Sequence, residues 1–458
     1  MKIKIQNLGP VQEACIDLRK KITVFCGPNN TGKTYVSYVV YALTSGNLFC
    51  LFPEQKDIKQ FMSTNRLAVT LDLNQLVEYR RECLNRIEKG LDSIFGISEE
   101  KLKQYFSKFA IEFSTSDDDL LTKAKEAAFK ISSKVDGCEF SLSKEANSSE
   151  VTIENVSKKS LRDREAGAFL TLLFSKIFSY LCFYPLIGSE ILPVERNSIY
   201  TFSKELSITR NFLVEQMQEL NSKPNISPME IVMKRSTRYP LPIKDCLEVA
   251  DDLARIQAQR GRFYQFAEEI EKELLQGKVF LGKEGDVLFS PDKAKRVKIP
   301  IHLTASIVKT LTSLVLYLRH RANENDLIII DEPELNLHPD CQILLARLLA
   351  KLSNQGFRLL ISTHSDYIIR ELNNLVMLAS IPENRRQEAI VALGYNSEVI
   401  ISKDDLGVYF FNYRSNRKVK VQELEVTDVG FDVKSIDDTI TKQNNVSETL
   451  FGILRYGE

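Results

Sequence analysis

The sequence KITVFCGPNNTGKT, residues 21–34, decides the fold of this chain. Its first six residues predict a short buried strand, and residues 34–43 predict a helix that carries almost no charge. Between them, residues 27–34 match the pattern GxxxxGK[ST] at every defined position. Because the pattern lies where a strand runs into a helix, we expect a phosphate-binding P-loop here.

The P-loop predicts a nucleotide site with roles for individual residues. Backbone N–H groups of such a loop surround phosphate oxygens, and the N-terminus of the following helix adds partial positive charge. We expect Lys33 to contact the β- and γ-phosphates of ATP, and Thr34 to be a Mg²⁺ ligand. A chance match in a glycine-containing turn is the alternative, which the strand-loop-helix context disfavours. The predicted nucleotide-binding residues are Gly27, Pro28, Asn29, Asn30, Thr31, Gly32, Lys33 and Thr34.

A second apolar strand ends in two carboxylates. Residues 327–332 read LIIIDE, so a buried strand delivers Asp331 and Glu332 to one point. We expect Asp331 to be a metal ligand that holds Mg²⁺ through water. Glu332 is the predicted catalytic residue that accepts a proton from the attacking water. A capping pair beyond a strand is the alternative, but it does not explain why a buried apolar strand delivers two acids to one point.

A histidine follows a third buried strand. Residues 358–362 predict this strand, and His364 lies just beyond it in the run STHS, residues 362–365. Ligands of parallel sheets bind at the carboxyl ends of the strands, so we expect His364 to be a second catalytic residue that hydrogen-bonds the γ-phosphate. A satisfied structural histidine is the alternative, and the two motifs above favour the catalytic one.

Together these motifs closely resemble the RecF, SMC and OLD-like branch of the ABC ATPases. The resemblance rests on GPNNTGKT at 27–34, DEPELNLHP at 331–339 and STHS at 362–365, and covers roughly the first 45 residues and residues 278–378. It implies an α/β fold: an ABC-type P-loop ATPase head with a mainly parallel sheet, interrupted by a large, mostly helical insertion. Its cofactors would be ATP and Mg²⁺, and its activity ATP hydrolysis.

The resemblance also implies a homo-oligomer in which two ATPase heads pair head to tail. ATP held by one subunit would then be closed over by the signature helix of the other. The sequence lacks the transporter-type LSGGQ pattern, and Ser306 is the nucleotide-contact candidate by position, with plain helix capping an equal alternative. Residues 192–198, LPVERNS, look like the PxxR loop of OLD-like ATPases, where Arg196 could reach a phosphate or partner, or lie in a surface turn.

Motif positions divide the chain into four parts. We expect the first part of the ATPase head at 1–46, and a mostly helical insertion at 47–274, of which a part around 186–200 could return to the head. The second part of the head is expected at 275–380, and an extension with short strands at 381–458. Lys33 and Asp331 are 298 positions apart, a separation that favours the repair and defence branch over transporters.

Composition excludes several classes of protein. The 458 residues include 61 Lys plus Arg and 61 Asp plus Glu, so no net basic field indicates a nucleic-acid or anionic-membrane partner, and nucleic acid stays possible but not evident. The local cluster Lys234, Arg235 and Arg238 beside Tyr239 could touch nucleic acid, or form a solvated face. Scattered cysteines and the absence of a signal predict a cytoplasmic protein. Residues 168–187 are apolar but contain Lys176, which favours a buried core helix over a membrane span.

The remaining sequence suggests what the ATPase serves. OLD nucleases continue into a Toprim domain with an Asp-x-Asp motif, and no such motif follows residue 378. The chain therefore resembles the stand-alone ATPase components of bacterial antiphage systems such as Septu and PARIS, whose effector, here expected to be a nuclease, is a separate protein. A RecF-like repair ATPase that acts directly on DNA is the alternative. A scaffold that binds ATP without hydrolysing it is a third reading, against which Glu332 argues.

Overall fold

The structure, a computed structural model, describes residues 1–45, 54–135, 138–157, 163–206, 239–283, 285–414 and 418–456. The predicted basic cluster of Lys234, Arg235 and Arg238 lies outside these residues.

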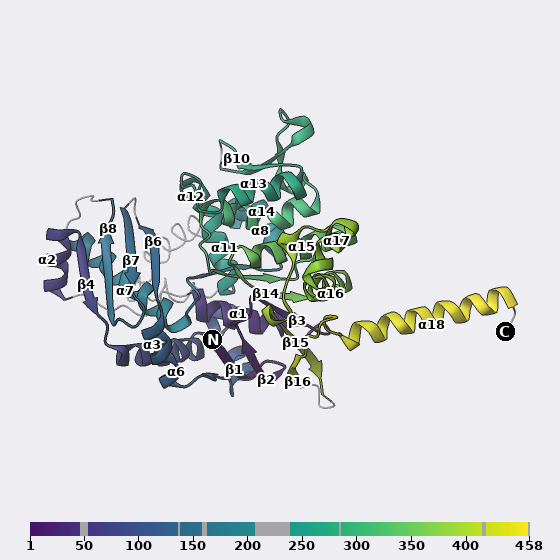
Figure 1. Ribbon diagram of the computed structural model, residues 1–458, viewed down its shortest axis with the longest axis horizontal. Helices are drawn as coiled ribbons and strands as arrows, with labels where there is room; N and C mark the ends of the chain where they lie inside the picture. The colour runs from purple at the N-terminus through teal and green to yellow at the C-terminus, as the bar shows by residue number, and fades with distance from the viewer. Residues whose placement is uncertain are drawn as a thin grey trace, which may run out of the picture.

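A large sheet occupies the centre of the protein (Figure 1). Among the described residues it has nine strands, in the order β5-β1-β2-β16-β15-β3-β14-β13-β9. Five of its eight pairings are parallel and three are antiparallel. Its strands are β1 (Lys2–Leu8), β2 (Val11–Asp17), β3 (Ile22–Cys26), β5 (Ala110–Phe113), β9 (Ser189–Leu192), β13 (Leu327–Asp331), β14 (Arg358–Thr363), β15 (Leu406–Tyr413) and β16 (Val419–Leu424).

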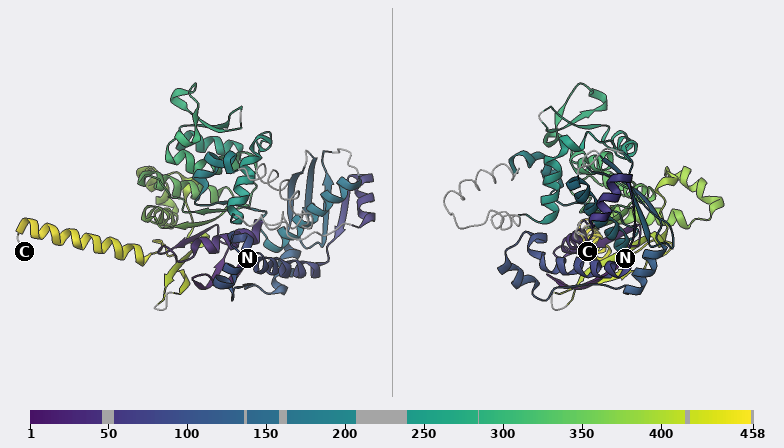
Figure 2. Two further views of the ribbon diagram at one scale, coloured as in Figure 1. Left: turned by 180° about the vertical axis from the view of Figure 1, so that it is seen from behind. Right: turned by 90° about the vertical axis from the view of Figure 1, so that its left-hand side faces the viewer.

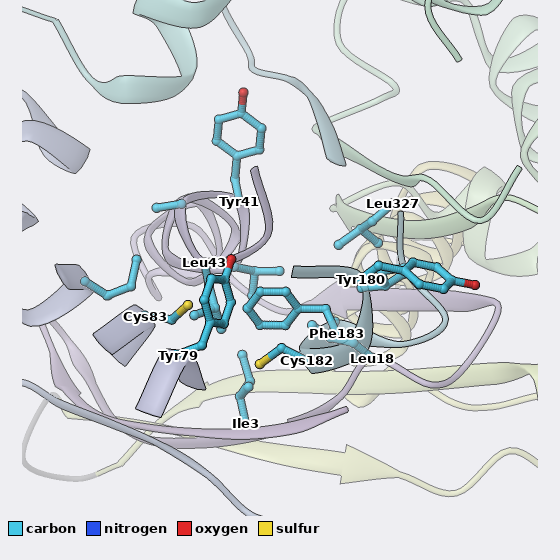
Figure 3. Packing of buried hydrophobic residues seen from close by; sticks show 14 of the residues in the cluster. Ile3, Leu18, Tyr41, Leu43, Tyr79, Cys83, Tyr180, Cys182, Phe183 and Leu327 are labelled. Atoms are coloured by element: carbon cyan, nitrogen blue, oxygen red, sulfur yellow. The ribbon is translucent and has the colours of Figure 1, made fainter. Parts of the chain in front are cut away.

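The central strands are mostly apolar because both of their faces are buried. In β13, Leu327 and Ile329 join the hydrophobic core on one side of the sheet, and Ile328 and Ile330 join the core on the other side. This alternation follows from the two-residue period of a strand. Figure 3 shows the first core, in which Ile3, Leu327 and helix residues pack together.

Helices cover both faces of the sheet. The first core includes residues of α1, α3 and α7, and the second includes residues of α13, α14, α15 and α16. These helices are α1 (Lys33–Ser45), α3 (Leu73–Lys89), α7 (Asp163–Phe183), α13 (Tyr264–Ile270), α14 (Ser306–His320), α15 (Pro339–Asn354) and α16 (Asp366–Ser380). The predicted α/β fold class with helices on both faces of a mainly parallel sheet is confirmed.

Two smaller sheets lie outside the central one. One has the order β4-β8-β7-β6 and the other β10-β11-β12, as far as the described residues show. The hairpin expected at 138–156 is confirmed as β7 and β8, which pair antiparallel. The rest of the first sheet, β4 and β6, was not expected in the segment between 47 and 274, where the sequence pattern indicated mostly helices. These strands are β4 (Arg66–Thr70), β6 (Phe129–Val135), β7 (Cys138–Lys144), β8 (Glu150–Asn155), β10 (Gly277–Leu281), β11 (Val287–Pro291) and β12 (Ile299–Pro300).

Strands from three parts of the sequence complete the central sheet. β9 pairs in parallel with β13, so residues 189–192 lie in the same sheet as the P-loop strand. β15 pairs in parallel with β3, so part of the segment expected to be an extension forms the middle of the sheet. The apolar run of β15 could not by itself indicate which strand it pairs with.

The remaining helices complete the part of the fold that the structure describes. The four-stranded sheet and α18 are at opposite ends of the molecule (Figure 2). From residue 441 to residue 455 every residue of α18 except Gly452 is exposed. These helices are α2 (Gln55–Thr64), α4 (Leu91–Phe95), α5 (Glu99–Phe106), α6 (Asp117–Glu126), α8 (Arg196–Leu206), α11 (Leu241–Asp251), α12 (Leu253–Ile256), α17 (Glu383–Leu393) and α18 (Lys434–Tyr456).

Helix α7 contains the apolar segment that the sequence predicts to be a buried core helix. Over Ala166–Phe183 it is the one described helix that is long and apolar enough to cross a membrane, and 67% of that stretch is buried inside the protein. Leu170 and Leu173 are fully buried in the first core. This burial is typical of a core helix, as predicted. All seven cysteines of the described residues are free thiols.

Candidate active site

Three adjacent parallel strands bring the sequence motifs to one edge of the sheet. β3, β14 and β13 are neighbours, and their register places Cys26 opposite Thr363 and Ser362 opposite Asp331. Because parallel strands end at the same edge, the P-loop, the acid pair and the histidine segment all follow strand ends that lie side by side.

Backbone geometry that requires glycine shapes the P-loop. Gly27 has φ +130°, and a Cβ atom there would clash with the backbone carbonyl oxygen of Phe411 in β15. Gly32 has φ +89°, and a Cβ atom would lie 2.8 Å from a methyl group of Val11. Side chains rarely adopt such φ values, so glycine is needed at both positions. Helix α1 begins immediately afterwards, at Lys33.

Lys33 reaches back into the loop. Its Nζ donates hydrogen bonds to the carbonyl oxygens of Gly27 at 3.0 Å and Pro28 at 2.8 Å. Burial lowers the pKa of Lys33 to about 8, while the charges of Asp331 and Glu332 oppose that shift. The cavity of the P-loop therefore contains a cation whose present partners are weak neutral acceptors, which a phosphate could replace.

Asp331 is almost fully buried, with 1% of its surface exposed. The Ser362 hydroxyl donates to its Oδ1, and a hydrogen bond with Thr34 also favours the ionised form. Burial is the largest influence and raises the pKa of Asp331. Its Oδ2 is buried and has no hydrogen-bond partner of normal geometry among the described residues. An orphaned carboxylate oxygen beside a threonine hydroxyl fits a Mg²⁺ ion, which takes oxygen ligands.

Glu332 lies in a turn with a left-handed backbone, at φ 46°. Its N–H donates to the backbone oxygen of Ser362 at 3.0 Å, which ties the turn to the end of β14. The side chain is 34% exposed, and its Oε1 is 3.9 Å from Nε2 of His364. Burial and the neighbouring charge of Asp331 raise the pKa of Glu332. A partly exposed carboxylate at this edge can meet a water molecule.

His364 bridges the acid pair and the P-loop. Burial, followed by the positive charge of Lys33, lowers the pKa of His364 to about 4, so the imidazole is neutral near pH 7. The side chain also hydrogen-bonds the backbone of Gly27. The N–H of His364 donates to Oε1 of Glu334 at 2.6 Å, and the Thr363 hydroxyl donates to the same oxygen at 2.9 Å.

Three further residues hold the site and were not predicted to do so. Glu334 anchors the histidine segment, and Ser362 anchors the acid pair. Both residues lie within the sequence motifs, but the sequence alone does not predict their contacts. Tyr413, at the end of β15, donates from its hydroxyl to the backbone oxygen of Asn30 at 2.8 Å. No local pattern singles it out, since β15 joins the site only through the fold.

Arg196 corrects one expectation. It is 1% exposed and donates to backbone oxygens of Asp331 and Glu332, so the surface-turn interpretation is wrong. Ser306 lies apart from the P-loop motifs as an exposed residue at the start of α14. The capping alternative for Ser306 is also wrong, because Ala305 is the N-cap residue and no side chain caps this helix.

A P-loop, a pair of acids at a strand end and a strand-end histidine at one edge of an α/β sheet define the chain as a P-loop ATPase. Residues 1–369 match the AAA ATPase domain family, and the chain belongs to that family. It is therefore an enzyme that hydrolyses ATP. No curated protein sequence matches it.

Solved structures of SMC heads match this chain at low identity. The SMC head domain from Thermotoga maritima is 10% identical with a TM-score of 0.33, and the match covers 93% of this chain and 98% of that chain. The Smc head domain with an extended coiled coil, bound to the C-terminal domain of ScpA and derived from Pyrococcus furiosus, is 12% identical with a TM-score of 0.37, covering 97% and 98%. At these values no partner or substrate is transferred to this chain.

Proposed function

We propose that the chain is an ATP-driven switch of the RecF, SMC and OLD-like branch whose heads pair and which controls a separate effector. One observation carries the proposal. The P-loop cation Lys33, the acid Glu332 and the neutral His364 come from three separate segments and lie within interaction distance at one sheet edge. This arrangement supplies a phosphate cradle and a candidate base together.

The phosphate cradle is the P-loop from Gly27 to Thr34. In this proposal its N–H groups bind the ATP phosphates, and Lys33 exchanges its two carbonyl partners for phosphate oxygens. Thr34 and Asp331 would hold Mg²⁺, which would supply positive charge to offset the negative charge of the phosphates.

Hydrolysis is assigned to Glu332 and His364. Glu332 accepts a proton from the attacking water, for which its half-open position beside the P-loop is suitable. In the free protein the His364 ring hydrogen-bonds the backbone of Gly27, which places it at the P-loop. A neutral imidazole has one N–H group, which could donate to a phosphate oxygen in place of that bond. Because Glu332 would be the general base, its replacement should stop turnover and leave ATP bound.

In this proposal two heads pair through Ser306, which is exposed. At the start of α14 its hydroxyl and the free N–H groups of the helix could meet a γ-phosphate held by a second copy. We expect the Glu332→Gln protein with ATP to sediment as a larger species than without nucleotide. An unchanged sedimentation coefficient under both conditions would contradict ATP-driven pairing.

The effector part of the proposal concerns a cytoplasmic antiphage system of the Septu or PARIS kind. It is supported by the neutral net charge and by the lack of an Asp-x-Asp motif after residue 378. In this proposal the ATPase transmits its state to the effector through contacts, and ATP would shift the population of one arrangement over another.

Pull-down of a neighbour-encoded nuclease with and without ATP tests this role. We expect its retention to depend on the nucleotide, and the purified chain to cut neither DNA nor RNA. Metal-dependent cleavage by the isolated chain, abolished by changing an acid after residue 378, would overturn the separate effector. ATPase activity that DNA stimulates in the isolated chain would instead favour the RecF-like alternative.

A further inference from the structure

Arg196 is a buried arginine whose hydrogen bonds go to backbone oxygens. It is the first residue of α8 and follows β9, the strand that pairs with β13. Nη1 donates to the carbonyl oxygen of Pro193 at 3.0 Å and to that of Asp331 at 2.6 Å. Nη2 donates to the carbonyl oxygen of Glu332 at 2.6 Å. One guanidinium group thus holds two consecutive carbonyl groups of the acid pair.

Burying this charge is costly, and the site around it offsets part of the cost. Burial lowers the pKa of Arg196 to about 10, so the group stays charged near pH 7. The charges of Asp331, Glu334 and Glu332 favour that charged form. A planar guanidinium presents several donors in a fixed fork, a geometry that an ammonium group cannot reproduce.

The backbone conformation of Glu332 indicates the role of the Arg196 guanidinium group. Glu332 has φ 46°, a left-handed conformation that is uncommon for a residue with a long side chain. The Arg196 fork fixes the carbonyl groups on both sides of this φ, and the Ser362 backbone oxygen accepts from the Glu332 N–H. The direction in which the Glu332 carboxylate leaves the chain is therefore set by contacts to its backbone.

We propose that Arg196 is a positioning residue that holds Glu332 in the orientation needed for hydrolysis. Helix α8, which Arg196 begins, packs against α11 and α14. The packing of these helices is thereby linked to the backbone of the catalytic acid. This inference rests on the proposed role of Glu332 and adds a residue that acts through the backbone of the acid pair.

The test compares Arg196→Lys and Arg196→Met in the full chain. We expect kcat to fall by about 10- to 100-fold, as misplacement of a catalytic group by ~1 Å does, while the Kd for ATP changes by less than about 3-fold. Arg80→Met is the matched control, because Arg80 is also buried and donates to backbone oxygens of Thr115 and Ser116, away from the site. Arg80→Met should keep the parental kcat.

A double-mutant cycle separates positioning from general structural support. Because Arg196 acts through Glu332, adding Arg196→Lys to Glu332→Gln should lower the remaining rate little further. A full additional loss would overturn the inference, and so would folded Arg196 variants with parental kcat, or a loss of ATP binding that matches the loss of turnover. Thermal unfolding shows whether Arg196→Met folds. If it does not, the kcat and the Kd for ATP of Arg196→Lys, which keeps the charge, test the inference. A parental rate in Glu332→Gln alone would overturn the proposed function itself.

Discussion

The phosphate-binding side of the active site is one continuous stretch of chain, whereas the hydrolytic side is assembled from three segments. Residues 27–34 form the P-loop by their own backbone geometry, and Lys33 folds back onto Gly27 and Pro28. On the hydrolytic side, Glu332 has its backbone held by Arg196 from another part of the sequence.

The two sides of the active site therefore depend to different extents on contacts with distant parts of the chain. A contiguous loop keeps its shape wherever a strand and helix support it, so changes to it should act on binding. An acid held through long-range backbone contacts can be displaced while the loop stays intact, so changes around it should act on turnover. A change on the hydrolytic side is therefore expected to lower turnover without a matching loss of ATP binding.

The largest expected effect is on the phosphate-binding side. Lys33→Ala removes the loop cation, and we expect ATP affinity to fall by about 10- to 100-fold, as loss of a charged hydrogen bond does. Because Lys33 would also contact the reacting phosphate, kcat should fall too, by about 100-fold or more. Isothermal titration and phosphate release measure the two quantities.

Lys144 offers the matched control for that change. It is also buried, and its Nζ donates to the backbone oxygens of Lys125 at 2.8 Å and Ala127 at 2.6 Å in the outer sheet region. Lys144→Ala should lower the melting temperature but leave ATP affinity at the parental value. Equal losses of affinity in both variants would show that Lys33 acts through folding.

A smaller effect is expected from a support of the hydrolytic side. Ser362→Ala removes the hydroxyl that donates to Asp331, and we expect kcat to fall by about 10-fold, equivalent to one charged hydrogen bond, with ATP affinity nearly unchanged. Ser353→Ala is the control, since this buried hydroxyl donates to the Ala350 backbone oxygen within α15. If Ser362→Ala has the same kcat as the Ser353→Ala control, the Ser362 hydroxyl does not assist hydrolysis.

The smallest expected effect concerns pH. The pKa of His364 is lowered to about 4, so the folded free protein keeps the ring neutral as pH falls from 8 to 5. The stabilisation that this neutral form gives is present above pH ~6.5 and is lost as pH falls toward 4. The pH profile of kcat/KM, which reports the free enzyme, should show no His364 inflection near 6.5. Such an inflection, present in the parent and absent from His364→Gln, would contradict the neutral histidine.

Sequence predicted the contiguous parts of the site and missed those made by the fold. The P-loop, the strand that ends at Asp331 and the strand before His364 were readable because each is a local pattern. Arg196 was noticed, but its partners are more than 130 positions away, so its burial could not be read. Tyr413 gave no signal, since its contact depends on β15 pairing with β3.

The fold shows the same division. Alternating apolar strands and helices predicted the α/β class and both flanks of the P-loop. The central place of β15 in the sheet depends on pairing between segments almost 400 positions apart, which carries no local pattern. The four-stranded sheet was read only at its hairpin, where a turn lies between strands 138–144 and 150–155.

The most direct test of separate binding and hydrolytic sides measures bound ATP and its conversion to ADP in the same sample of Glu332→Gln. We expect ATP to bind with the parental Kd and single-turnover conversion to slow by about 100-fold or more, as loss of a general base does. Conversion at the parental rate, or a loss of ATP binding as large as the loss of conversion, would contradict the assignment of Glu332 and the separation of the two sides.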